Sequence, residues 1–235
     1  MRKLFVAVFG LLLAAAPAAA QDKPFDVNVG GGWTFPTADF KNDFNTGGHF
    51  GIGGTFYVKP TFGVGVEYMY HRMNGPDRTL TVYPTPNAAG GVSQLFESNH
   101  QINSVTFNGV WRPHSSGMVG GYVIGGIGYY HRAIDITTPA VGYTTICDPY
   151  WLVCYPALVS TDRIVGTRSS NDFGINIGGG VTFGHNAKFY VESRYHYVWG
   201  PDFTADKANL PADFNGRTSF TANAAYFPLT FGIRF

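Results

Sequence analysis

The stretch YFPLTFGIRF, which covers Tyr226–Phe235, alternates between two kinds of side chain. Successive side chains of a β-strand point to opposite faces, so alternation with a period of two predicts a strand. One set of positions carries threonine, glycine and arginine and predicts a partly polar face. The other set predicts a wholly apolar face, which consists of Phe227, Leu229, Phe231, Ile233 and Phe235.

Seven earlier segments alternate in a comparable way, with glycine, proline and asparagine between them. Most of these segments have a length close to that of a tilted transmembrane strand, which is about 10 residues. This is roughly twice the average strand length in soluble proteins. One segment is apolar or glycine at both sets of positions, and there we expect Val123, Ile127 and Tyr129 to face outward. The seven segments are 25–35, 49–59, 62–73, 101–112, 121–134, 173–183 and 188–199.

The connections between these segments alternate strictly between short and long. Transmembrane barrels have short periplasmic turns and longer extracellular loops, with both ends of the chain on the periplasmic side. The pattern therefore predicts an all-β fold, an eight-stranded antiparallel up-and-down transmembrane β-barrel. Its predicted outer loops are 36–48, 74–100, 135–172 and 200–217.

Aromatic residues lie at both ends of the apolar faces, as in the aromatic belts of membrane barrels. A small soluble β-sandwich would alternate too, but its inner face would be apolar, whereas here the second face carries glycine and polar residues. The predicted periplasmic belt is Phe25, Phe62, Trp111, Phe183, Phe189 and Phe235, and the predicted outer belt is Trp33, Phe35, Tyr70, Tyr197 and Trp199.

The first twenty residues have the three parts of a secretory signal peptide. A basic start precedes an apolar run, Leu4–Ala16, and small residues precede Gln21. An uncleaved anchor is the alternative, but the run is short for a spanning helix. We expect residues 1–20 to be removed and residues 21–235 to form the barrel domain.

Charge and motifs exclude several functions. Without Arg2 and Lys3 the chain has 14 basic and 15 acidic residues, so no basic excess points to nucleic acid. No pattern of ligands suggests a metal or a cofactor, and we expect none. We also expect a monomer in contact with outer-membrane lipid and lipopolysaccharide.

The closing FPLTFGIRF and the glycine-rich strands GGYVIGGIGYY and FGINIGGGVTF resemble those of small eight-stranded outer-membrane β-barrel proteins. This group contains the OmpA-like barrels and the opacity-type surface proteins. In these families a last strand ending in phenylalanine resembles the signal read by the barrel-assembly machinery. The resemblance implies that Phe231, Ile233 and Phe235 serve as this signal and that the assembly machinery is a partner.

The inward faces carry charged residues. Eight strands leave an interior about wide enough for side chains to fill, and unpaired charges there would be costly. We therefore favour a charged plug that holds the barrel shut over a gate for ions. The predicted lumen charges are Glu67, Arg112, Glu192, Arg194 and Arg234, with His71 and His196 nearby.

The longest predicted loop contains the two cysteines of the chain, within CDPYWLVC. Because exported proteins mature in an oxidising compartment, we predict a disulfide between Cys147 and Cys154. It would hold an apolar knob outside the cell. The knob is either a binding surface or a cluster that packs on its own loop or on lipopolysaccharide headgroups, and it consists of Tyr150, Trp151, Leu152 and Val153.

These observations favour a structural or surface-interaction protein that binds an extracellular ligand through its loops, since binding residues concentrate on loops held by a rigid scaffold. The alternative is a narrow porin-like channel for small solutes or ions. A lipid-modifying enzyme is the weakest hypothesis. The nearest catalytic pattern, His114–Ser116, lies in a predicted periplasmic turn and lacks a third group, so we predict no enzyme.

Overall fold

The computed structural model describes residues 24–82, 92–113, 118–148, 153–184, 187–204 and 219–235. The predicted signal peptide and the His114–Ser116 turn lie outside these residues, and so do Tyr150, Trp151 and Leu152 of the predicted knob. No helix in the described part of the chain is long and apolar enough to cross a membrane.

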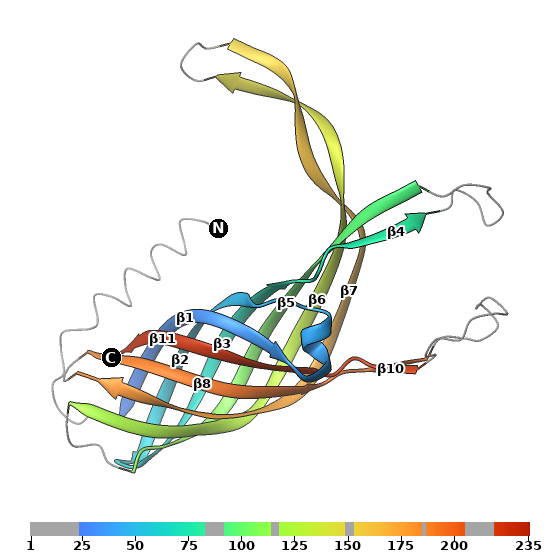
Figure 1. Ribbon diagram of the computed structural model, residues 1–235. Coiled ribbons are helices and arrows are strands. Elements are labelled where there is room, and N and C mark those ends of the chain that lie inside the picture. The colour runs from blue at the N-terminus through green and yellow to red at the C-terminus, as the bar shows by residue number, and fades with distance from the viewer. Residues whose placement is uncertain (1–23, 83–91, 114–117, 149–152, 185–186, 205–218) are drawn as a thin grey trace.

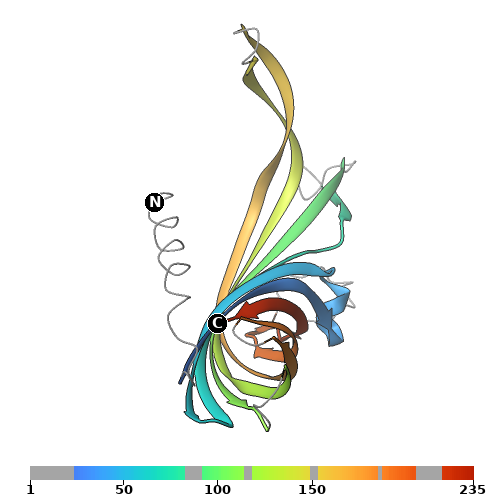
Figure 2. The same cartoon turned by 90° about the vertical axis from the view of Figure 1, so that its left-hand side faces the viewer.

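Eight long antiparallel strands form a closed barrel, as predicted (Figures 1 and 2). Each of these strands pairs with the next one along the chain, β11 pairs with β1, and β3 pairs directly with β5, because within the described residues the short strand β4 pairs only with β5 and is not part of the ring. The prediction of an eight-stranded up-and-down barrel is therefore confirmed. The strands are β1 (Phe25–Thr37), β2 (Gly47–Lys59), β3 (Phe62–Asn74), β5 (Val92–Trp111), β6 (Val119–Asp148), β7 (Val153–Phe183), β8 (Lys188–Trp199) and β11 (Ala224–Arg234).

The long connections contain more regular structure than the sequence suggested. Strands β6 and β7 stay paired from Val119–Phe183 to Asp148–Val153, so most of the predicted loop 135–172 is a twisted hairpin that projects from the barrel (Figure 1). Alternation did not indicate this hairpin, because a two-stranded ribbon outside the wall has no face that must be apolar. The other connections contain β4 (Arg78–Val82), which pairs with β5, the pair β9 (Asp202–Thr204) and β10 (Ser219–Thr221), and the 3₁₀ helix η1 (Ala38–Asn42).

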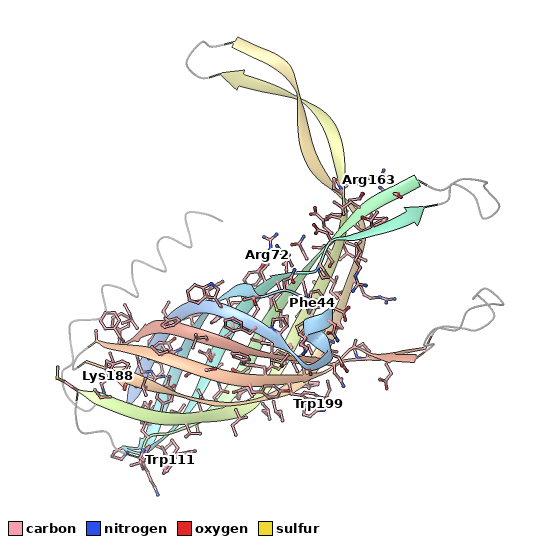
Figure 3. The ribbon with its side chains drawn as sticks, in the orientation of Figure 1. Phe44, Arg72, Trp111, Arg163, Lys188 and Trp199 are labelled. Carbon is pink, nitrogen blue, oxygen red and sulfur yellow. The ribbon has the colours of Figure 1, made fainter. Side chains whose placement is uncertain are left out.

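The outward faces of the wall are apolar and exposed. All six residues of the predicted periplasmic belt are exposed, as are Trp33 and Trp199 of the outer belt, while its other three residues are half-buried. Figure 3 places Trp111 and Lys188 at the end with the short turns, and Phe44 and Trp199 at the end with the hairpins. In the fifth segment, 121–134, the outward face is the one that we expected, because Val123, Ile127 and Tyr129 are exposed.

An arginine in place of Ile127 tests which surface meets lipid. Ile127 is 66% exposed and pairs with Phe107 and Ile175 in mid-wall. A charge near the bilayer midplane of a barrel costs about 2–4 kcal/mol, and we expect Ile127→Arg to lower the free energy of unfolding in lipid vesicles by that amount. The matched control is Ile164→Arg, because Ile164 is 61% exposed but lies on the projecting hairpin. Equal losses in the two variants would contradict the assignment.

Candidate functional site

A cluster of buried charges lies inside the barrel wall. The guanidinium of Arg194 on β8 is 2.5 Å from carboxylate oxygens of both Glu67 on β3 and Glu192 on β8. Each carboxylate also accepts a neutral hydrogen bond, Glu67 from Asn28 at 3.1 Å and Glu192 from the Tyr122 hydroxyl at 2.6 Å. All five side chains are buried. The sequence predicted inward charges but did not indicate that one arginine bridges both glutamates.

The other two predicted lumen arginines have different partners. Arg112 lies just beyond the end of β5, where its Nη1 is 3.4 Å from Asp26 and its guanidinium is 3.5 Å from the ring centre of Tyr57. Arg234 is buried, and its guanidinium lies 4.6 Å from the ring centre of Tyr122. No ion pair joins Arg234 to a carboxylate within the described residues, so aromatic rings take the place of a counter-charge.

Aromatic and imidazole rings fill the lumen beside the charge cluster. The ring of Tyr226 contacts the rings of His71 and His196, and its centre lies 5.0 Å from the centre of each. The rings of His196 and Tyr226 are nearly parallel. His196 also shares a 3.0 Å hydrogen bond with the Tyr130 hydroxyl, and His71 shares one of 2.8 Å with Thr34. All five residues have essentially no exposed surface, so this layer is closed to solvent.

An apolar cluster lies at the hairpin end of the lumen. Phe40 of η1 is buried there, and Phe44 packs against the same cluster from the segment that follows. The helix η1 joins β1 to β2 at this end (Figure 1), and its Phe40 packs into the cluster. The buried members are Phe40, Met73, Ile102, Tyr130, Val198, Ala224 and Tyr226.

A cleft of about 650 Å³ opens at the hairpin end, above the apolar cluster. Its walls come from η1, the β4–β5 hairpin, the base of the β6–β7 hairpin and the residues just before β11. Both apolar and charged side chains line the cleft. They are Asp39, Phe40, Asp43, Phe44, Arg78, Phe96, Glu97, His100, Arg132, Ile134, Ile136 and Val165, with Pro76, Ser98, Gly166, Ala222 and Asn223.

The charges of this outer cleft differ in how firmly they are held. Arg132 is buried, and it donates to Asp172 at 2.6 Å and to the carbonyl of Ala222 at 2.8 Å. Arg78 and Asp43 form an ion pair of 2.9 Å that remains exposed to solvent. The outer cleft therefore has one rigid charged wall and one wall whose charges can rearrange around a ligand. The residues that the structure describes contain no group of three or more histidine, cysteine or acidic side chains that could hold a metal ion.

The remaining predicted residues lie at the two ends of the molecule. The backbone of Cys147 pairs with that of Cys154 in the β6–β7 hairpin. The disulfide stays a prediction, because the structure does not describe the side chains of these two cysteines. The side chain of Val153 from the predicted knob also lies outside the described part of the chain. Phe235 exchanges two backbone hydrogen bonds with Val27, of 2.9 and 3.0 Å, which join the last residue to β1. Phe231 and Phe235 are exposed on the outward face and Ile233 is half-buried, and their role as an assembly signal stays a prediction.

Sequence reasoning missed most partners of the lumen charges. Tyr122 and Tyr190 lie in the lumen at inward positions, which a period of two can indicate, but that period does not show which charges their rings meet. Tyr122 has room because the facing position is Gly180, where an added Cβ would lie 2.6 Å from the Tyr122 hydroxyl. The outer cleft had no signal of its own, because it forms only where four separate connections meet.

Comparison with known proteins places the chain in a family. A family model described as an outer membrane protein beta-barrel domain matches residues 6–226. No curated protein matches the chain.

The chain is also similar in fold to several solved outer-membrane structures. They include Ail, the attachment invasion locus protein of Yersinia pestis, in complex with sucrose octasulfate (15% identity, 90% of this chain and 97% of that chain, TM-score 0.43). Neisserial surface protein A is 12% identical over 90% of this chain and 96% of that chain (TM-score 0.46). OprG of Pseudomonas aeruginosa is 11% identical over 93% of this chain and 99% of that chain (TM-score 0.44). Because the family model spans most of the chain, this protein belongs to the outer-membrane protein β-barrel domain family and resides in the bacterial outer membrane.

Proposed function

We propose that this protein is a surface-interaction protein, in which a filled barrel holds extracellular hairpins that bind a ligand at the outer cleft. The observation that carries the proposal is the outer cleft of about 650 Å³ at the hairpin end of a lumen occupied by side chains. Small eight-stranded barrels have little interior space, so their loops offer more surface for binding than their lumen.

The contents of the lumen support this function over a channel. A conducting path would have to pass the charge cluster around Arg194 and the layer that contains Tyr226. The ion pair between Arg194 and Glu67 ties β8 to β3 across the barrel, so opening it would leave a buried charge unpaired. The filling is therefore better suited to stabilise a scaffold than to pass solutes.

The composition of the outer cleft supports binding. Exposed apolar side chains, among them Val165 and Ile136, line the same cleft as Asp39 and Glu97. Binding sites are commonly concave, mostly apolar and supplied with a few polar groups that orient the ligand. The outer cleft therefore suits an extracellular ligand that presents an apolar group next to hydrogen-bond donors.

Single-channel recording of the refolded protein in a planar bilayer tests the choice between scaffold and channel. We expect no discrete openings from the wild-type protein, with folding verified by the heat-dependent shift on a gel. The same recording on Arg194→Ala determines whether the charge cluster is what blocks the lumen. Discrete openings of the wild-type protein would overturn the proposal in favour of a narrow channel.

Labelling of intact cells tests whether the outer cleft faces the exterior. Val165 lines the outer cleft and is 56% exposed, while Val58 is 62% exposed near the short turn between β2 and β3. We expect a membrane-impermeant maleimide to label Val165→Cys at least about tenfold faster than Val58→Cys, because the outer membrane shields the periplasmic end. The wild-type chain gives the background of the native cysteines, and equal labelling of both variants would contradict the orientation.

A further inference from the structure

A second hollow, separate from the outer cleft, lies on the outside of the barrel wall. It measures about 500 Å³ and is located at the hairpin end of β2 and β3. Its lining includes Gly48 and Phe50 of β2, Tyr70 and Arg72 of β3, and the polar residues Thr46 and Asn74 at the strand ends. Because this part of the wall carries the outward apolar face, the hollow opens toward lipid rather than toward the lumen.

The hollow exists because an outward position holds glycine. Gly48 pairs with Trp33 of β1 on one side and with Arg72 of β3 on the other. An added Cβ at Gly48 would meet only one atom within 4 Å, the Gly32 carbonyl oxygen at 3.8 Å. The backbone therefore does not require glycine here, and the missing side chain leaves space between a tryptophan and an arginine.

Arg72 is the one arginine or lysine among the residues that line the hollow, where the buried His49 is the other basic side chain, and the position of Arg72 along β3 is informative. The outward positions that precede it are apolar or aromatic, and they are Phe62, Val64, Val66, Tyr68 and Tyr70. Arg72 is exposed, and within the described residues it forms no ion pair with a carboxylate. Figure 3 places it at the end of the wall from which the hairpins extend. A cation directly beyond an aromatic belt lies at the level of the lipid headgroups.

The aromatic residues beneath Arg72 form a continuous shelf. The ring centre of Phe50 is 6.0 Å from that of Tyr70 and 6.2 Å from that of Tyr68. Phe50 is 51% exposed, so the shelf presents its surface to the membrane. An acyl chain can lie along this shelf, and a group bound by Arg72 would then sit at the upper end of that chain.

We propose that this hollow binds one molecule of a phosphorylated, acylated glycolipid of the outer leaflet, with a phosphate on Arg72 and an acyl chain on the shelf of Phe50 and Tyr70. A guanidinium matches phosphate with two parallel hydrogen bonds, and the low polarity of the surroundings strengthens them. Thr46 and Asn74 supply neutral groups beside the phosphate for a sugar hydroxyl. The proposal is independent of any ligand at the outer cleft, since the two hollows share no lining residue.

Native mass spectrometry of the refolded full chain, titrated in detergent with bis-phosphorylated lipid A, tests the proposal. We expect one lipid A to be retained, and Arg72→Gln to weaken its binding about tenfold, because a hydrogen bond to a charged group is worth that factor or more. Gly48→Trp places a large side chain at the hollow, where the added Cβ would be in ordinary contact with the Gly32 carbonyl oxygen at 3.8 Å, and we expect a comparable loss. Removal of the phosphates from lipid A should weaken its binding to the wild type about tenfold. The same removal should not change binding to Arg72→Gln, because that variant already lacks the cation that would bind the phosphate.

Two matched controls lie at the periplasmic end. Lys59→Gln removes an exposed cation at the other end of β2, and Gly121→Trp adds the same side chain at an exposed glycine, where an added Cβ would meet no atom within 4 Å. Neither should change the retention of lipid A, and the heat-dependent gel shift verifies that every variant is folded. Unchanged binding in Arg72→Gln or in Gly48→Trp would overturn the proposal. Equal retention of phosphatidylglycerol would overturn it as well, since the site would then recognise any anionic lipid.

Discussion

Replacement of Arg194 by alanine is expected to lower the free energy of unfolding by about 3–5 kcal/mol, because it leaves two buried carboxylates without a counter-charge. Glu67 and Glu192 would keep only the neutral hydrogen bonds from Asn28 and Tyr122. Urea titration of tryptophan fluorescence in lipid vesicles measures the change. Glu192→Ala should also lower the midpoint, since it removes one of the two carboxylates that hold Arg194.

The matched control for this prediction is Arg78→Ala. Arg78 forms an ion pair of 2.9 Å with Asp43, but both side chains are 59% exposed, and such pairs contribute at most about 1 kcal/mol. A neutral triple variant, Glu67→Gln with Glu192→Gln and Arg194→Met, should recover most of the lost stability, because it removes all three charges of the cluster together. A loss in Arg194→Ala no larger than that in Arg78→Ala would show that the charge cluster is not a structural element.

The second large effect is expected at Tyr226. Its ring is fully buried between His71, His196 and Phe40, and truncation of a large buried side chain to alanine costs about 3–5 kcal/mol. The same urea titration in vesicles measures the loss in Tyr226→Ala. The cost arises from the cavity left in the lumen and from the lost ring contacts.

Tyr226→Phe separates the ring from its hydroxyl. The hydroxyl is buried and makes no hydrogen bond within the described residues, so its removal eliminates an unsatisfied polar group. We expect Tyr226→Phe to be as stable as the wild type or more stable. If Tyr226→Phe lost as much as Tyr226→Ala, the hydroxyl would have to be held by a partner such as an ordered water, and packing of the ring would not be the main contribution.

The sequence was most informative about the barrel wall, where each side chain faces either lipid or the lumen. In a closed barrel every second residue meets lipid, so the alternation in residues 226–235 predicts both the strand and its outward face. Alternation could not distinguish the two faces of segment 121–134, because both are apolar or glycine, although Val123, Ile127 and Tyr129 do face outward as we expected. It failed for the β6–β7 hairpin, because a ribbon outside the membrane has no lipid face to select its residues.

The sequence by itself therefore determined the number of strands, the outward apolar face with its aromatic belts, and the set of residues that point inward, because these depend on the local period of the chain. Only the tertiary structure decided which inward residues meet. Arg194 reaches Glu67 on another strand, and His49 lies 2.9 Å from Thr230, 181 residues away, because closure and strand register bring them together. The outer cleft and the hollow at Gly48 likewise depend on side chains from separate strands and connections, and no period within one segment records such contacts.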